Sequence, residues 1–338
     1  MKKLFALLSI LLTFSLVFSL TGCENEAVSS DTTPPANSGN YTAIDMSVAC
    51  LQGPTGVGMA KLMEDSAKKK TANNYTFTVT SAPDEITGKF LKGEINIASL
   101  PTNVAAKLHA KNADKVTMLA VNTLGVLSIL ENGESIKSVA DLKGKTIYST
   151  GEGSNPEFIL KYILKENKID PETDVTINFV ANNQELNAAL ISGKATVAMV
   201  PEPAATTVLN KKNTLKRVLS INDEWEKVSE SKLMMGCVVA LKSFVEENPK
   251  QVEKFLSEYE ASVKFAKESI DYASELCEKY EIVTEAAIAK KAIPNCNLTY
   301  VLGKDAKNDI SGYFEVLFDF DKESIGGALP QDTFYYGK

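Results

Sequence analysis

The chain has 338 residues, a length that predicts two domains with substantial cores. Hydrophobic residues make up 44% of it and charged residues 23%, which is too polar for a protein with many membrane spans. The formal net charge of −7 argues against a nucleic-acid partner, and the single histidine (His109) and single arginine (Arg217) argue against histidine metal centres, Ser-His-Asp triads and arginine clamps. We therefore expect no metal site, no cofactor and no catalytic residues.

The first residues have the features of an export signal. A basic start is followed by an apolar stretch over residues 4–20 and then by Thr21, Gly22 and Cys23, which predicts a signal peptide over residues 1–22. Residues 20–23 resemble a bacterial lipobox, in which the cysteine receives a diacylglycerol. We expect Cys23 to be lipidated, so that the protein is extracytoplasmic and anchored to the membrane. An uncleaved transmembrane anchor is the alternative, because the apolar stretch approaches the roughly 20 residues that span a bilayer.

Residues 23–40 are predicted to be a flexible tether. The segment is rich in Ser, Thr, Pro, Asn and Gly and has no apolar periodicity, so it cannot bury a core of its own. The folded body is therefore expected to begin near residue 41.

An internal repeat defines the folded body. Residues 75–108 align with residues 175–208 without a gap at an offset of 100, so that Glu85 matches Glu185 and Pro101 matches Pro201. Each copy predicts a strand, an amphipathic helix, a buried strand and a second helix. At the same offset, strands at 46–50 and 146–150 precede helices at 56–69 and 155–166. We predict an α/β fold of two Rossmann-like lobes with parallel-rich sheets.

Two further β-rich runs are interpreted as hinge crossings between the lobes. Residues 115–130 are broken at 123–125, and residues 233–241 follow the second repeat, with Gly125 and Gly236 supplying backbone freedom. Residues 244–320 are predicted to be mostly helical, with helices at 249–267 and 305–318 packing on the first lobe. The expected boundaries are 41–124 and 237–338 for lobe I, and 125–236 for lobe II.

Ligands of such sheets bind beyond the carboxyl ends of the strands, where helix N-termini point their amides. This places the site between a first rim (residues 52–56, 81–84 and 100–103) and a second rim (residues 149–154, 182–183 and 200–203). The candidate ligand residues of the first rim are Gln52, Gly53, Pro54, Thr55, Gly56, Pro83, Asp84, Pro101, Thr102 and Asn103. Those of the second rim are Thr150, Gly151, Glu152, Gly153, Ser154 and Glu202.

Each rim feature has a structural alternative. Residues 53–59 lack the Gly-Lys-Ser/Thr ending of a nucleotide-binding loop, so their glycines indicate either close approach of a ligand or a simple turn. Asp84, Glu152 and Glu202 each lie near a helix start, where a carboxylate can cap the helix instead of binding a ligand. Asn103 has the same two interpretations.

Several other residues are expected to be structural. Cys50, Cys237, Cys277 and Cys296 have no metal-ligand spacing, and either a Cys277–Cys296 disulfide or buried thiols fit the sequence. His109 is predicted on a solvated helix face. Trp225 is predicted to pack in a short helix, whereas Met234 and Met235 fit either the cleft or the core.

Taken together, these segments resemble a type II periplasmic binding protein. The resemblance covers about residues 41–336 and rests on residues 52–56, 98–102, 141–145, 200–203 and 248–249. It is strongest for the nitrate, sulfonate and taurine group that also contains binding proteins for thiamine precursors. It implies a monomeric lipoprotein that captures a small organic solute by hinge closure and delivers it to an ABC permease and ATPase. An exported enzyme on the same fold and a sensor remain the alternatives.

The charge of the rims suggests the class of solute. The rim segments contain Asp84, Glu152 and Glu202 but no Lys or Arg. A solute with an amine or a protonatable heterocycle could pair with one of these carboxylates, so we predict a neutral-to-cationic nitrogen-containing solute. An alkanesulfonate, taurine or nitrate is the alternative, because helix N-termini bind anions without basic side chains.

Overall fold

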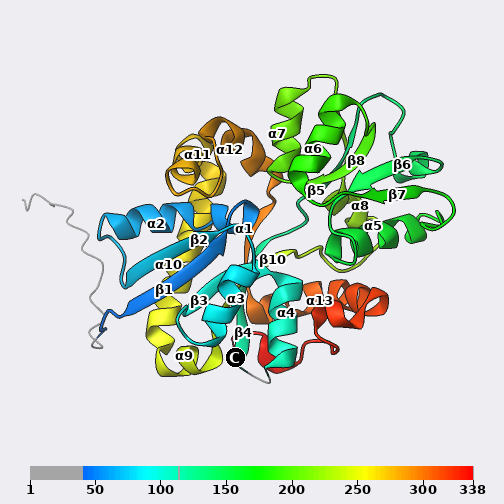
Figure 1. Ribbon diagram of the computed structural model, residues 1–338. Helices are drawn as coiled ribbons and strands as arrows, with labels where there is room; N and C mark the ends of the chain where they lie inside the picture. Colours follow the sequence, from blue (N-terminus) through cyan, green and yellow to red (C-terminus); the bar gives the residue numbers. More distant parts are fainter. Residues whose placement is uncertain (1–40, 113–114, 338) are drawn as a thin grey trace, which may run out of the picture. The chain divides into compact units, whose positions relative to one another are not determined.

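The computed structural model describes residues 41–112 and 115–337. These residues form two β-sheets, each with parallel and antiparallel strands, and helices surround the sheets (Figure 1). The predicted signal peptide, Cys23 and the predicted tether lie outside the described residues. None of the helices that the structure describes is long and apolar enough to cross a bilayer.

The larger sheet has six strands in the order β11-β4-β10-β3-β1-β2. Its strands are β1 (Asp45–Leu51), β2 (Asn74–Thr80), β3 (Ile97–Pro101), β4 (Val116–Thr123), β10 (Gly236–Leu241) and β11 (Leu298–Leu302). β1 pairs in parallel with β2 and β3, whereas β10 pairs antiparallel with β3 and β4. The parallel half is the part that the repeat predicted.

The smaller sheet has five strands in the order β7-β6-β8-β5-β9. Its strands are β5 (Leu127–Glu131), β6 (Thr146–Ser149), β7 (Thr176–Phe179), β8 (Val197–Pro201) and β9 (Lys216–Ser220). β6 pairs in parallel with β7 and β8, and β5 pairs antiparallel with β8 and β9. The order β2-β1-β3 in one sheet and β7-β6-β8 in the other confirms the predicted repeat.

The helices follow the strands in the predicted alternation. They are α1 (Pro54–Val57), α2 (Ala60–Ala67), α3 (Asp84–Leu91), α4 (Thr102–Lys111), α5 (Asn155–Glu166), α6 (Asn183–Ser192), α7 (Ala204–Lys211), α8 (Ile221–Glu226), α9 (Lys242–Glu247), α10 (Pro249–Glu268), α11 (Ile270–Lys279), α12 (Ala286–Ala292) and α13 (Gly303–Phe320). The helix predicted over residues 56–69 is divided into α1 and α2. The strand β11 interrupts residues 244–320, which were predicted to be mostly helical.

The chain passes from one sheet to the other at residues 124–126 and again at 227–235. Gly125 and Gly236 lie at these passages, but both are required by close packing. A Cβ at Gly236 would lie 2.0 Å from Thr123 Oγ1, and one at Gly125 would lie 2.7 Å from Leu233 Cδ2. The interpretation that these glycines supply backbone freedom has no support in their conformations, since neither has a positive φ.

The core runs through both sheets without interruption. Trp225 is fully buried, its indole N–H donates to Ser231 O at 2.8 Å, and its ring packs against Tyr162 and Tyr313. The predicted packing role of Trp225 is confirmed, and Met234 is also fully buried. All four described cysteines are buried free thiols, and among the described residues no cluster of His, Cys, Asp and Glu could hold a metal ion.

The prediction that His109 lies on a solvated face is wrong. The side chain is 6% exposed, its Nδ1 is 2.8 Å from Val116 O, and its ring packs against Phe334. The C-terminal segment, which the sequence did not place, covers this face of α4.

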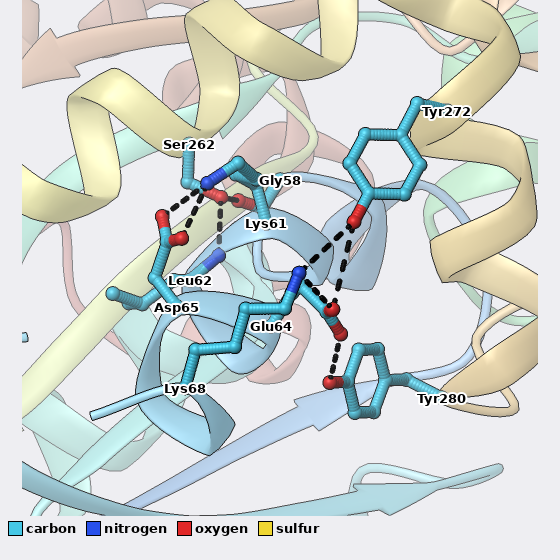
Figure 2. Close-up of polar contacts among 9 residues, drawn as sticks. All are labelled: Gly58, Lys61, Leu62, Glu64, Asp65, Lys68, Ser262, Tyr272 and Tyr280. Atoms are coloured by element: carbon cyan, nitrogen blue, oxygen red, sulfur yellow. Dashed lines mark hydrogen bonds and ion pairs between the residues drawn. The ribbon is translucent and has the colours of Figure 1, made fainter. Parts of the chain in front are cut away.

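A buried carboxylate joins α2 to α11 (Figure 2). Glu64 accepts from the Lys279 ammonium at 2.5 Å and from the Tyr280 hydroxyl at 2.7 Å, and it pairs with Lys68 at 2.8 Å. The Lys279 ammonium first, then Lys68 and Tyr280, lower the pKa of Glu64 to about 2.

Glu64→Gln should lower the free energy of unfolding by about 1 kcal/mol at neutral pH, because the charge-assisted hydrogen bonds are lost. The ordinary pKa of this carboxyl is 4.5 and the folded value is about 2, so its stabilising contribution is complete above pH 4.5 and is lost as the pH falls toward 2. The difference between wild type and variant should therefore shrink over that window in denaturant unfolding. The control is Glu268→Gln, which removes an exposed pair with Lys264 at 4.0 Å. Equal losses for both variants would contradict the prediction.

Candidate functional site

The predicted rims lie at the carboxyl ends of the parallel strands. β1 and β3 lead into α1 and α4 through Gln52–Gly53 and Pro101, while β6 and β8 lead into α5 and α7 through residues 150–154 and 202–203. Each helix start leaves first-turn N–H groups without an intrahelical acceptor. The two rims therefore present polar backbone groups at corresponding edges of the two sheets.

The rims approach each other at Gly53. This residue has φ 87°, a left-handed conformation that glycine adopts at little cost. Its N–H donates to Ile282 O at 2.8 Å, and a Cβ built on it would lie 3.4 Å from Pro203 Cδ. Pro54 is the first residue of α1. Gly56 is buried, and a larger residue would not fit there, since a Cβ would lie 2.3 Å from Leu51 O.

Several polar groups of the first rim are used within the fold. Gln52 Nε2 donates to Glu281 O at 3.1 Å, and Thr55 O accepts from Ser99 Oγ at 2.9 Å. Pro83 and Asp84 start α3, where Asp84 is exposed, and Asn103 is half-buried in the first turn of α4.

A buried amide beneath the first rim was missed by the sequence analysis. Asn122 Nδ2 donates to Ser99 Oγ at 2.7 Å and to Tyr259 OH at 2.9 Å. Burial raises the pKa of Tyr259, so its hydroxyl stays protonated in this network. The available signal was an amide side chain in a strand whose other residues are apolar or threonine.

The second rim is held by its own hydrogen bonds. Ser154 Oγ donates to Gly151 O at 2.6 Å, and Thr150 Oγ1 donates to Asn183 Oδ1 at 3.3 Å. Gly153 N–H donates to Glu157 Oε2 at 2.7 Å. Both Gly151 and Gly153 have positive φ, whereas Glu152 is exposed. Hydrogen bonds within the loop therefore hold the segment that leads into α5.

Two helix starts meet around one tyrosine hydroxyl. Asn155, the first residue of α5, donates from Nδ2 to Tyr313 OH of α13 at 2.8 Å. Thr102, the first residue of α4, lies beside the same hydroxyl, and its own hydroxyl donates to Met234 O at 2.7 Å. Asn155 and Tyr313 were not among the candidate residues; the position of Asn155 directly after a predicted ligand loop was the available signal.

Glu202 is not a free carboxylate. Its side chain is fully buried, it forms an ion pair with Arg217, and it accepts from Thr206 N–H at 3.3 Å in the first turn of α7. Arg217 comes from β9 and also donates to Ser128 Oγ. The hydrogen bond from Thr206 N–H supports the interpretation that Glu202 caps α7. The sequence did not indicate a cation beside the second rim, because Arg217 is 15 residues away from Glu202 along the chain.

Four cavities of the described residues lie away from the predicted ligand residues. One of about 1120 Å³ is lined by α10, β11 and residues 332–337, and one of about 280 Å³ lies between α7 and α12 beside Arg217 and Lys291. The rims approach each other at Gly53 and Pro203, where a Cβ added to Gly53 would lie 3.4 Å from Pro203 Cδ.

Solved structures share this fold. An ABC transporter protein from Parabacteroides distasonis is 22% identical, with a TM-score of 0.74 over 87% of this chain and 99% of that chain. The periplasmic aliphatic sulphonate binding protein SsuA from Escherichia coli is 16% identical, with a TM-score of 0.66 over 87% and 94%. The nitrate-binding protein NrtA from Synechocystis PCC 6803 is 12% identical, with a TM-score of 0.53 over 78% and 74%. These likenesses confirm the type II periplasmic binding protein fold.

No curated protein matches the sequence. A family model described as "ABC transporter, phosphonate, periplasmic substrate-binding protein" matches residues 62–282, which is more than half of the chain. This family consists of transport proteins that bind small solutes and work with a permease and an ATPase; it is not an enzyme class. The chain therefore belongs to the phosphonate family of periplasmic substrate-binding proteins of ABC importers.

Proposed function

We propose that the protein captures a small organic oxyanion, of the phosphonate or sulfonate class, between the two rims. The observation that carries this proposal is the pairing of Glu202 with Arg217, because it neutralises the one buried carboxylate of the rims. The first-turn N–H groups of α4 and α5, whose starts meet at the Tyr313 hydroxyl, are then the principal donors for a ligand, and helix N-termini favour anions.

This proposal replaces the prediction, made from the composition of the rims, that the solute is a neutral-to-cationic nitrogen-containing molecule. A cationic solute would need a free carboxylate, and Glu202 is occupied, while Asp84 and Glu152 are exposed to solvent. An exposed carboxylate contributes little to a specific ion pair because water screens it. The family description and the sulphonate- and nitrate-binding structural relatives support an oxyanion independently.

Calorimetry on ligand-stripped protein should detect binding of methylphosphonate or methanesulfonate, whereas an aminopyrimidine should produce no heat. Glu202→Gln should lower the melting temperature, since Arg217 loses its partner, but should leave oxyanion affinity unchanged. Binding of the aminopyrimidine, lost in Glu202→Gln, with both oxyanions silent would overturn the proposal in favour of a cationic solute.

We also propose that capture involves rotation of two lobes, residues 41–124 with 237–338 and residues 125–236. The two passages between the sheets at 124–126 and 227–235 are the places where a rotation would occur. Contacts across the lobes include Gly53 with Pro203 and the hydrogen bond from Lys291 Nζ of α12 to Asn210 Oδ1 of α7 at 2.5 Å. The exposed bond between α12 and α7 would favour the closed arrangement.

Lys291→Ala should shift the ligand-free protein toward an open form by about twofold to fivefold, the value of one exposed hydrogen bond. Small-angle scattering should then report a larger radius of gyration, which methylphosphonate reverses. Lys290→Ala is the matched control, because Lys290 lies next to Lys291 on α12 and itself pairs with Asp271 at 2.7 Å within lobe I. Identical scattering from the two variants would contradict the hinge proposal.

We propose further that the protein is a lipoprotein held to the membrane through Cys23. The support is the lipobox-like run at residues 20–23, and the family's extracytoplasmic location fits it. In cells given radiolabelled palmitate, wild type should be labelled and found in membranes. Cys23→Ser should be unlabelled, whereas Asn37→Ser in the predicted tether should behave as wild type. Normal labelling of Cys23→Ser would refute the anchor.

A further inference from the structure

A cavity of about 1120 Å³ lies in lobe I, away from both rims. Its walls are formed by α10, β11 and the C-terminal segment of residues 332–337. None of its lining residues is a predicted ligand residue, and all of them belong to residues 41–124 and 237–338. Ligand sites in proteins commonly have volumes of about 300–1,000 Å³, so this space is large enough for a second small molecule. A molecule bound there would not depend on rotation of the lobes.

Main-chain hydrogen bonds hold the C-terminal wall of this cavity in place. Tyr336 N–H donates to Met118 O of β4 at 3.0 Å, and Tyr336 O accepts from Lys304 N–H of α13 at 2.9 Å. The two segments are so close that a Cβ at Gly303 would lie 2.2 Å from Met118 O. Because the backbone is fixed in this way, the cavity is preformed and little ordering of the protein opposes binding.

The hydroxyl of a nearly buried tyrosine opens on the cavity. Tyr335 lines the cavity and is 8% exposed, and its hydroxyl has no hydrogen-bond partner among the described residues. The enclosed side-chain atoms without a partner in this part of the chain belong to Asn155 and Asn187, so the Tyr335 hydroxyl must be reached from the cavity. Burial and the Asp332 carboxylate raise the pKa of Tyr335, which keeps its hydroxyl protonated at neutral pH. It can therefore bond to water, or to a ligand that displaces the water.

Acidic side chains outnumber basic ones around the cavity. Glu253 and Glu260 are exposed, and because they are seven residues apart they lie on the same face of α10. Among the residues that the structure describes, neither they nor Glu246 of α9 form an ion pair, whereas Asp332 is paired with Lys307 at 2.6 Å. The charged side chains that line the cavity are those of Glu246, Glu253, Glu260, Asp332, Lys242 and Lys304. The local charge therefore favours a cation.

The less exposed part of the cavity is apolar and aromatic. It contains the rings of Tyr300 and Tyr336 and the side chains of Val245, Leu256 and Leu302. Tyrosine rings attract ammonium groups over their faces, and apolar side chains favour a ligand with a hydrocarbon body. No cluster of His, Cys, Asp and Glu among the described residues could hold a metal ion, so the cation that fits this cavity is organic.

We propose that this cavity is a second ligand site, which binds a small organic ammonium ion with an aromatic or aliphatic body. The ammonium group donates to the Tyr335 oxygen in the field of the unpaired glutamates, and the body packs against Tyr300 and Tyr336. The same glutamates disfavour anions, so this cavity and the rims take ligands of opposite charge. The two sites are also separate, because the cavity is lined by one lobe and the rims come from both.

Calorimetry with three indole compounds of similar shape tests the proposal: tryptamine, which is a cation, tryptophol, which is neutral, and indole-3-propionate, which is an anion. Wild type should bind tryptamine roughly tenfold more tightly than tryptophol, and indole-3-propionate should produce no heat. Tryptamine affinity should be the same with and without saturating methylphosphonate. Displacement of tryptamine by methylphosphonate, or equal affinities for tryptamine and tryptophol, would overturn the inference. Binding of tryptamine by Lys338→Ala but not by wild type would show that the last residue of the chain fills the cavity, and would also overturn it.

Substitutions around the cavity locate the binding. Tyr335→Phe removes only the hydroxyl and should weaken tryptamine binding about threefold to tenfold. Glu253→Gln combined with Glu260→Gln should weaken it by a similar factor and leave tryptophol binding unchanged, since only charge is lost. The control combines Glu268→Gln with Glu275→Gln, at two exposed positions that are also seven residues apart but lie outside the cavity. Thermal melts verify folding, and the glutamate variants decide the test if Tyr335→Phe is unstable. Unchanged tryptamine affinity in a folded variant of either kind, or an equal loss in the control, would refute the site.

Discussion

The arrangement of the molecule depends on the pairing of parallel strands, because two parallel neighbours can be joined only by a segment that crosses back over the sheet. β1 and β3, and equally β6 and β8, satisfy this requirement with helices, so every strand of the parallel halves ends at a helix start. The polar backbone groups of four helix starts are thereby gathered at two sheet edges. The binding chemistry of the protein follows from this constraint more than from any individual side chain.

The antiparallel strands turn these two edges into one site. β4 continues into β5 of the other sheet, and β9 is followed by α8 and then by β10 of the first. The two passages lie close together and are packed by Trp225, Tyr313 and Met234, which belong to a single core. Because the core is continuous, the starts of α4 and α5 reach the same tyrosine hydroxyl. This meeting of two helix starts at Tyr313 could not arise within either sheet alone.

The electrostatics of the site also depend on tertiary neighbours. Rim composition is acidic, yet the buried rim carboxylate is paired with the only arginine of the chain. Leaving a fully buried carboxylate unpaired would be far more costly than an exposed one, so the partner had to be supplied by a neighbouring strand. Glu64, joined to Lys279 and Lys68, follows the same rule away from the site. The acidic overall charge therefore says little about the charge that a ligand meets.

The sequence by itself determined the repeat, the parallel strands within each sheet, and the helix starts after β1, β3, β6 and β8. These features depend on local periodicity and on residues such as Pro101 and Pro201, whose effects are confined to a few neighbours. The sequence did not predict β11, because its five residues form strand hydrogen bonds only when they lie beside β4. It also did not predict the burial of His109, because Phe334, which is far away in the chain, packs against it. The pairing of Glu202 with Arg217 and the hydrogen bond between Asn155 and Tyr313 were decided by tertiary structure alone, because each depends on which side chain from another element lies beside it.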